Sequence, residues 1–216
     1  MFKEDKEVQG LGDTKDRVAV FYIFGHETRQ KRLMAYQVSF TLSMSVDAVK
    51  QEEWQVQIEK VETNSPIFAG EMAIADHMTT PITNFYFLDR KENTFVSRIQ
   101  FNKSTKTWGK ITPLRIEAEN EGESTHLTCQ RFNNENDDKC AMSTNGAIIY
   151  KALIPSEETN ESSISVKDLR RLRISGENYP AKIQLGGDYV LVATKPMRLE
   201  SAPKILIWDA PNSSAD

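Results

Sequence analysis

Polar and apolar residues alternate most regularly across residues 36–46, which read YQVSFTLSMSV. The apolar members are Tyr36, Val38, Phe40, Leu42, Met44 and Val46. Successive side chains of a β-strand point to opposite faces, so this pattern places an apolar face against a core and leaves a polar, uncharged face opposite. The pattern predicts a central β-strand around which the fold is organised.

Other segments carry strand patterns as well. Residues 18–24 form a continuous apolar run, rich in β-branched and aromatic residues, which is typical of a strand buried on both faces. Residues 84–88 and 95–101 flank a charged turn and predict a hairpin. A second hairpin is predicted where residues 183–185 and 189–194 flank Gly186-Gly187-Asp188. Further strand patterns cover residues 54–58, 108–116, 127–132, 147–153 and 205–208.

Helical signals are short. Residues 165–174 predict a helix, because Ser165 and Asp168 form a capping-box arrangement and Gly176 follows as a stop signal. Residues 48–53 predict a helical turn capped by Asp47, and Ser65-Pro66 predicts the start of a helix running toward residue 78.

The strand and helix patterns together predict a mainly β fold, an antiparallel sandwich or partly open barrel of about eight to ten strands with one or two short helices.

The length of 216 residues fits one large all-β domain or two small ones. Residues 1–16 are polar and lack the apolar core of a signal peptide, so we expect a flexible lead-in, either in a cytoplasmic protein or after removal of a signal. Residues 17–210 are expected to form a single β-rich domain, with two lobes divided near residues 117–124 as the alternative. Residues 211–216 are expected to form a polar tail.

Composition narrows the classes of partner. The net charge of −4 and the spread of basic residues give no indication of a nucleic-acid partner. Hydrophobic residues make up 39% of the chain, but no run of about 18 apolar residues is present. We therefore expect a soluble protein that does not span a membrane. The sequence does not indicate an oligomeric state.

Cys129 and Cys140 are the two cysteines, and they bracket the polar segment QRFNNENDDK. This spacing suits a disulfide that ties a hairpin together, which predicts a periplasmic or secreted protein. Two reduced thiols in a cytoplasmic protein are the alternative. His126 is the one histidine near the pair, so a structural zinc site would lack its fourth ligand.

Asn134, Asn136 and Asp138 repeat at every second position, as the first ligands of a calcium loop do. However, Lys139 stands where such a loop needs glycine, and the expected glutamate falls near Gly146. We predict a solvated loop, with calcium as the weaker alternative, and we expect no metal and no cofactor.

Catalytic patterns are weak. His26, His77 and His126 lie far apart in sequence, and neither Ser124 nor Ser143 sits in a nucleophile elbow. Gly186-Gly187 lies between strands and lacks the helix that follows a phosphate-binding loop. We expect a protein that is not an enzyme, with a hydrolase using His77 or His126 as an alternative.

Charged clusters suggest where a protein partner would dock. Arg170, Arg171 and Arg173 crowd the predicted helix, and Glu119 and Glu121 belong to an acidic stretch that runs to residue 138. Either cluster could steer a partner of opposite charge, and either could be a solvated surface.

The sequence favours a non-enzymatic protein-binding or inhibitor-type recognition domain outside the cytoplasm, for example a toxin-neutralising immunity protein or an envelope protein. The alternative is a carrier of a hydrophobic small molecule, in which the apolar face of residues 36–46 lines a barrel cavity.

Overall fold

The computed structural model shows a chain of strands and turns. It describes residues 6–9, 15–27, 29–44, 52–64, 66–67, 69–77, 79–89, 96–115, 124–132, 136–145, 147–157, 163–174, 178–196, 198 and 202–209. The chain divides into two compact units, Met1–Ile67 and Phe68–Asp216. The predicted lobe boundary near residues 117–124 falls almost entirely outside the described residues, as does the tail at residues 211–216.

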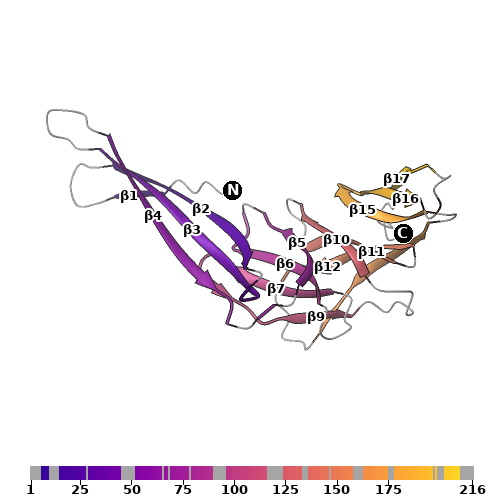
Figure 1. Cartoon of the computed structure of the whole chain (residues 1–216). Helices are drawn as coiled ribbons and strands as arrows, with labels where there is room; N and C mark the ends of the chain where they lie inside the picture. Colours follow the sequence, from indigo (N-terminus) through magenta and orange to yellow (C-terminus); the bar gives the residue numbers. More distant parts are fainter. Residues whose placement is uncertain are drawn as a thin grey trace. The chain divides into compact units, whose positions relative to one another are not determined.

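The N-terminal unit is one antiparallel sheet of order β1-β2-β3-β4 (Figure 1). Its strands are β1 (Lys6–Gln9), β2 (Lys15–Glu27), β3 (Arg32–Met44) and β4 (Glu52–Glu62). The predicted central strand is confirmed as β3, which pairs with β2 on one side and with β4 along the whole length of β4 on the other. Residues 6–9, within the expected flexible lead-in, form β1.

One face of this sheet is apolar. We call it the N-terminal apolar face, and it contains Phe21, Ile23, Tyr36, Val38, Phe40, Val56 and Ile58. Val38 is buried, and the rings of Phe21 and Phe40 stack with their centroids 5.2 Å apart. All described strands of the unit belong to this single sheet, and Ile58 keeps 65% of its surface exposed. The prediction that residues 18–24 are buried on both faces is therefore wrong for residues 19–24, none of which is buried.

The C-terminal unit contains three sheets. The first has the order β13-β9-β7-β6-β5, with β8 paired to β7. Its strands are β5 (Ala69–Ala75), β6 (Ile82–Asp89), β7 (Val96–Asn102), β8 (Thr107–Trp108), β9 (Thr112–Arg115) and β13 (Ile164–Ser165). The middle sheet contains β10 (Ser124–Arg131), β11 (Asp137–Thr144), β12 (Ile148–Pro155) and β14 (Lys167–Arg173) in that order. The third contains β15 (Asn178–Gly186), β16 (Tyr189–Pro196) and β17 (Ile205–Asp209).

Two hydrophobic cores place the middle sheet between the other two. Tyr86 and Leu114 of the first sheet share a core with Met142 and Tyr150 of the middle sheet. On the opposite face of the middle sheet, Ile149 shares a second core with residues of the third sheet. Alternation along β12 explains this arrangement, because Tyr150 and Ile149 are neighbours in sequence and face different layers. The sheets are open and none of them closes into a barrel, so the predicted antiparallel sandwich is confirmed and the barrel is not.

Both predicted hairpins are confirmed, as β6–β7 and as β15–β16, and Gly187 has the left-handed φ of 67° that the second turn requires. The helix predictions are wrong, because the described residues contain no helix. Within residues 165–174, Ser165 ends β13 and residues 167–173 form β14, and residues 69–75 form β5. Of the predicted turn at residues 48–53, the described residues belong to β4, and residues 48–51 lie outside the described part.

Pairing with β12 overrides the helical signal in β14. Leu169 packs against one core and Leu172 against the other, which a strand at the edge of the middle sheet allows. The register shifts between Lys151 and Leu153, and Asp168 in the opposing segment has a φ of 42°. The capping-box residue Asp168 thus belongs to a β-bulge. No described segment is a helix long and apolar enough to cross a membrane.

The layer arrangement predicts that two isoleucines contribute very differently to the free energy of unfolding. Ile149 is fully buried between the middle and third sheets, whereas Ile205 is 79% exposed. We expect Ile149→Ala to lower the free energy of unfolding by about 2–5 kcal/mol and Ile205→Ala to change it by less than about 0.5 kcal/mol. Denaturant unfolding of both variants measures the difference, and equal losses would contradict the assignment of layers.

Candidate functional site

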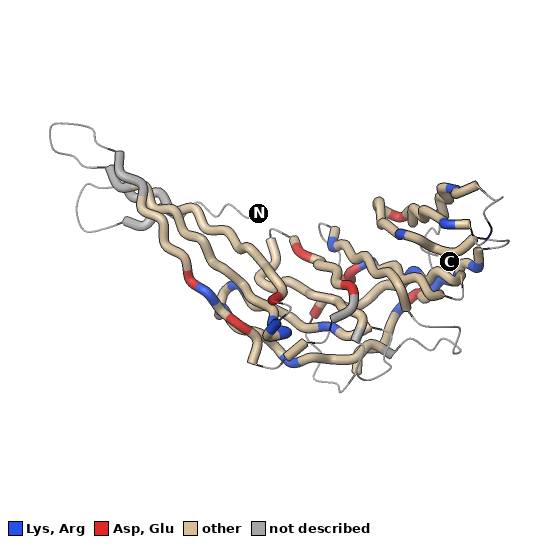
Figure 2. Tube along the Cα trace, viewed as in Figure 1, with Lys and Arg blue, Asp and Glu red and all other residues tan. Residues whose placement is uncertain are grey.

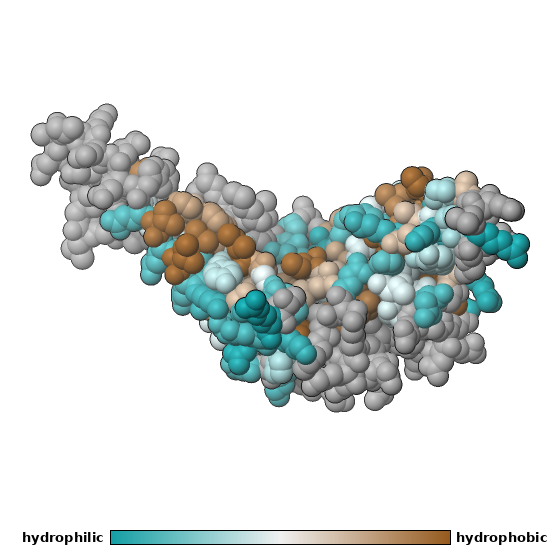
Figure 3. Space-filling view, in the orientation of Figure 1, coloured by the Kyte–Doolittle hydropathy of each residue, from teal (hydrophilic) through white to brown (hydrophobic). Residues whose placement is uncertain are grey.

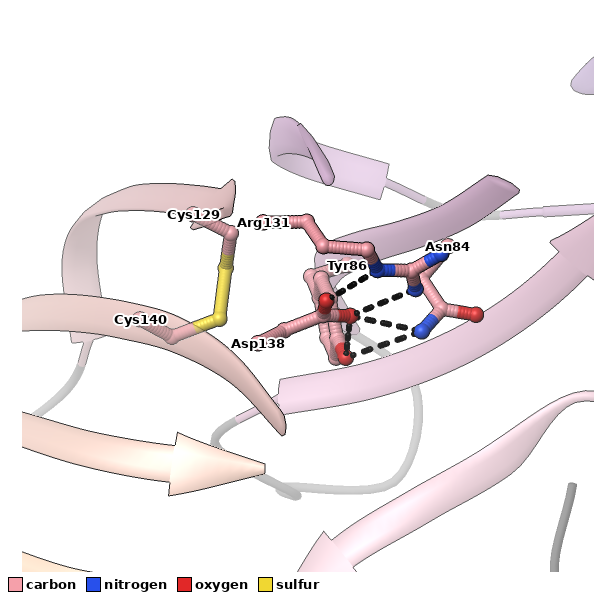
Figure 4. The surroundings of a disulfide bond; sticks show 6 residues. All are labelled: Asn84, Tyr86, Cys129, Arg131, Asp138 and Cys140. Atoms are coloured by element: carbon pink, nitrogen blue, oxygen red, sulfur yellow. Dashed lines mark hydrogen bonds and ion pairs between the residues drawn. A yellow bond between two sulfur atoms is a disulfide. The ribbon is translucent and has the colours of Figure 1, made fainter. Parts of the chain in front are cut away.

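A buried carboxylate, Asp138, is the centre of the largest polar cluster in the described core (Figure 4). Arg131 Nε lies 2.6 Å from Asp138 Oδ1, and Arg131 Nη2 donates to Oδ2 at 3.1 Å. The Tyr86 hydroxyl and Asn84 Nδ2 each donate to Oδ2 at 2.6 Å. The carboxylate therefore accepts four hydrogen bonds, its single negative charge is paired with the Arg131 guanidinium, and the group has no exposure to solvent.

Two facing sheets supply these four residues. Asn84 and Tyr86 lie two positions apart on β6 of the first sheet, so their side chains point to the same face. Arg131 and Asp138 are cross-strand partners on β10 and β11 of the middle sheet. The cluster therefore joins the two layers across their interface.

Further donors extend the cluster to backbone carbonyls. Gln100 Nε2 donates to Asn84 Oδ1 at 2.8 Å and to the carbonyl of Ser156 at 3.0 Å. Arg131 Nη1 donates to the carbonyl of Ile82 at 2.6 Å. Arg98 donates to the carbonyls of Pro155, the last residue of β12, and of Glu157, which follows the strand. These contacts hold a chain segment of the middle sheet against β6 and β7.

The arrangement is suited to holding structure rather than to catalysis. Burial, and then the negative charge of Asp138, raise the pKa of Tyr86 well above its usual value, so the phenol remains a hydrogen-bond donor. Both oxygens of the Asp138 carboxylate accept hydrogen bonds from core residues, one at Oδ1 and three at Oδ2. The structure therefore places Asp138 in strand β11 within the core, and the calcium alternative stays a prediction. Asn136 is exposed, and Asn134 lies outside the described residues.

The disulfide prediction is confirmed. Cys129 and Cys140 are bonded, with a sequence separation of 11 and Cα atoms 4.1 Å apart. They are cross-strand partners on β10 and β11, two positions along each strand from Arg131 and Asp138. The covalent link and the ion pair therefore occupy neighbouring positions on the same face of the middle sheet, next to the first sheet (Figure 4).

A second charged cluster occupies the other face of the middle sheet. Lys139 Nζ lies 3.1 Å from Asp188 Oδ1, and Lys151 Nζ donates to the carbonyl of Asp188 at 2.7 Å. Asp188 lies in the turn between β15 and β16, so the two buried lysines fasten the third sheet to the middle one. Burial lowers the pKa of Lys151, and the hydrogen bond from Lys139 lowers the pKa of Asp188.

The three arginines of the predicted basic docking cluster do not share one face of their strand. Arg170 pairs with Lys151 in the β12–β14 register, whereas Arg171 pairs with Tyr150 and Arg173 with Ile148. Opposed residues share a face, so Arg170 lies on the opposite side of the strand from Arg171 and Arg173. Arg170 Nε also lies 3.0 Å from Asp168 Oδ1. Glu119 and Glu121 lie outside the described residues.

The histidines have local partners. His126 Nδ1 lies 3.1 Å from Glu71 Oε2, and His77 Nδ1 lies 2.9 Å from the hydroxyl of Thr79, two residues along the same turn. Ser143 is fully buried beside the hydroxyl of Thr125. Within the described residues, no histidine is hydrogen-bonded to a serine or a cysteine, and no group of three His, Cys, Asp or Glu residues could hold a metal ion.

The core between the first and middle sheets contains a small cavity, which is not the cavity that the carrier alternative places against residues 36–46. The space lined by Leu127, Met142 and Tyr150 has a volume of about 10 Å³. A site for a small organic ligand typically has about 300 Å³ or more. The cavity is therefore no larger than a single water molecule needs.

The third sheet displays an exposed apolar surface. We call it the C-terminal apolar face, and it contains Tyr189, Leu191, Ile205 and Ile207. Their exposed fractions are 48%, 39%, 79% and 67%. Figure 3 shows hydrophobic atoms gathered at this sheet, and Figure 2 shows basic positions along its strands. The residues between them, such as Val190 and Leu206, point inward and pack in the second core.

Three lysines and one aspartate border the C-terminal apolar face, the aspartate being the exposed Asp209 opposite Tyr189. Lys182, Lys195 and Lys204 are exposed, and Lys182 and Lys195 alternate with inward residues so that they share the outer face. In the part of the chain that the structure describes, none of these three ammonium groups forms an ion pair. Sequence reasoning missed this surface because residues 189–194 and 205–208 are apolar at consecutive positions, which normally indicates burial on both faces.

Comparisons with known proteins assign no activity to these features. No protein-family model matches the chain, and no curated protein matches its sequence. The candidate site is therefore defined by its exposure, shape and charge alone. On those grounds the C-terminal apolar face is the strongest candidate, since both charged clusters in the core are internally satisfied.

Two adjacent aspartates test the role of the buried cluster. Asp138 is paired in the core, whereas Asp137 pairs with a lysine that is 59% exposed. We expect Asp138→Ala to lower the free energy of unfolding by about 3–5 kcal/mol, because it leaves Arg131 buried without a counter-charge. Asp137→Ala should cost less than about 1 kcal/mol. Denaturant unfolding of the two variants compares them, and a small effect at Asp138 would contradict the structural role.

The disulfide makes a separate prediction. Under denaturing, non-reducing conditions the protein should show no thiol that iodoacetamide can alkylate, and two after reduction. Replacing both cysteines with alanine should lower the free energy of unfolding by about 2–4 kcal/mol. Intact mass measures the first result and denaturant unfolding the second. Two alkylated cysteines before reduction would show that the bond does not form in the isolated protein.

Proposed function

We propose that the protein is a non-enzymatic recognition domain of inhibitor or envelope type, which binds another protein on its C-terminal apolar face. The observation that carries this proposal is the exposure of Ile205 and Ile207, at 79% and 67%, on one side of an ordered sheet. Contiguous exposed apolar side chains with a polar border are typical of protein interaction sites.

Charge indicates the chemistry of the partner. Lys182, Lys195 and Lys204 border the face and have no carboxylate partner among the described residues. A partner with an apolar centre and an acidic border would bury the isoleucines and pair the lysines at the rim. Its apolar contacts would supply most of the affinity, and its charges would favour fast association.

The disulfide supports a location outside the cytoplasm. Cys129 and Cys140 are bonded in the core, and such bonds form and persist in oxidising compartments. We therefore propose a periplasmic or secreted protein.

Capture of a partner by matched baits tests the proposal. The wild-type protein, Ile205→Gln/Ile207→Gln and Ile74→Gln are immobilised and exposed to an extract from the cells that produce the protein and from its surroundings. Ile74 is the matched control, because it is 44% exposed and belongs to the first sheet. We expect one protein to be retained by the wild type and by Ile74→Gln, and lost from the double variant.

Measurement of the Kd then distinguishes specific binding from nonspecific adhesion. The Kd of the retained protein should rise at least about tenfold in Ile205→Gln/Ile207→Gln, because central apolar contacts dominate such interfaces. Circular dichroism and unfolding of the variants show whether the fold is kept. Equal retention by all three baits would overturn the assignment of the binding surface.

A further inference from the structure

Strand β4 forms an outer edge of the N-terminal sheet. The sheet order is β1-β2-β3-β4, so β4 pairs with β3 on one side and with no described strand on the other (Figure 1). Residues 55–60 are all exposed, and because successive side chains alternate, the strand is exposed on both faces. The backbone N–H and C=O groups along such an edge can pair with a further strand.

The other edge strands of the described sheets carry features that oppose the addition of a strand. Natural sheets block their edges with very short strands, β-bulges or proline. Strands β1, β13 and β17 have 4, 2 and 5 residues. Strands β5, β10, β14 and β15 each contain a register shift, and β15 also contains Pro180. Each of these edges is therefore a poor template for a further strand.

Strand β4 has none of these features. Its 11 residues pair with β3 without a register shift, and none of them is proline. Residues 55–58 at its centre are uncharged, and Val56 and Ile58 are 56% and 65% exposed. A long, regular edge of this kind is suited to strand addition, in which an extended segment of another protein joins a sheet through backbone hydrogen bonds.

We propose that β4 binds an extended segment of a partner protein, which becomes a fifth strand of this four-stranded sheet. Alternation along β4 determines the chemistry of the segment, because an added strand contacts its neighbour on both faces. Val56 and Ile58 fit apolar residues opposite them, whereas Gln55 and Gln57 fit polar residues that hydrogen-bond to their amides. The segment therefore alternates apolar and neutral polar residues and contains no proline. This surface is separate from the C-terminal apolar face and gives the protein a second kind of contact.

Charge favours a foreign segment over a second copy of β4. Strands β3 and β4 together contain four glutamates, one lysine and one arginine, an excess of two negative charges. Pairing β4 with another β4 would bring two such edges together, and like charges on neighbouring strands oppose pairing. A segment with lysine or arginine at its ends instead complements the glutamates of β4.

A model peptide tests the proposed strand addition. The peptide KQVTVQITK, with blocked termini, alternates apolar and neutral polar residues between two lysines. One control peptide has proline in place of the central valine, and the other has glutamate in place of both lysines. Fluorescence anisotropy of labelled peptides measures their Kd for the full-length protein. We expect KQVTVQITK to bind, the proline peptide to have a Kd at least about tenfold higher because proline removes a backbone donor, and the glutamate peptide to bind more weakly.

Variants of the protein locate the binding site. Ile58→Lys places a charge in the apolar row of β4, which is how natural edge strands resist strand addition. Ile74→Lys is the matched control, because Ile74 is 44% exposed and lies on the bulged edge strand β5. The Kd for KQVTVQITK should rise at least about tenfold in Ile58→Lys and stay unchanged in Ile74→Lys and in Ile205→Gln/Ile207→Gln. Circular dichroism shows whether each variant keeps its fold.

Hydrogen exchange distinguishes backbone pairing from contact between side chains. Among the amides of residues 55–58, those that face the outer edge should become protected when KQVTVQITK binds, because exchange requires an open hydrogen bond. Absence of binding, or an equal Kd for KQVTVQITK and its proline variant, would overturn the inference. So would wild-type protein that forms dimers in sedimentation velocity while Ile58→Lys stays monomeric, because β4 would then bind a second copy.

The variant of the C-terminal apolar face separates this inference from the proposed function. Loss of peptide binding in Ile205→Gln/Ile207→Gln, with binding kept in Ile58→Lys, would overturn the β4 site and leave the proposed function standing. Peptide binding through β4, together with a capture experiment that retains no protein on Ile205 and Ile207, would support the β4 site and overturn the proposed function.

Discussion

The fold of the C-terminal unit depends on compensating one buried negative charge. Asp138 is fully buried between two sheets, where an unpaired carboxylate would cost several kcal/mol. Arg131 neutralises it from the adjacent strand, and Tyr86 and Asn84 complete its hydrogen bonds from the facing sheet. The first and middle sheets must therefore meet in one register, since a shift of one residue on β11 would turn Asp138 away from all three partners.

Alternation along β11 extends this constraint to the third sheet. Asp138 and Lys139 are consecutive, so their side chains face opposite layers. The first layer provides Tyr86 and Asn84 for the aspartate, and the third provides Asp188 for the lysine. Two neighbouring charges of opposite sign thus determine which face of the middle sheet meets which layer. Apolar residues alone would not distinguish the faces, because β12 carries buried apolar residues on both of its sides.

Local patterns predicted the parts of this fold that depend on neighbouring residues. Alternation identified β3, turn residues identified two hairpins, and spacing identified the disulfide between Cys129 and Cys140. The helix at residues 165–174 failed because its capping signal is local, whereas its strand structure comes from pairing with β12. For the same reason the sequence placed Asp138 in a solvated loop, with a calcium ligand as the weaker alternative. Its partners Asn84 and Tyr86 lie 54 and 52 residues away, and no periodicity relates positions so far apart.

The C-terminal apolar face is exposed because its strands are apolar on both sides, whereas only one side of their sheet is covered by another layer. Consecutive apolar residues belong in a sheet with layers on both sides, and β12 satisfies that rule. Strands β16 and β17 carry the same kind of sequence, with Val190 and Leu206 inward and Leu191 and Ile207 outward, but in the described part of this unit their sheet has a layer on one side alone. The outward residues contribute nothing to the core they adjoin, so their apolar character is not explained by folding of this unit. This outer face is the surface on which we propose that a protein partner binds.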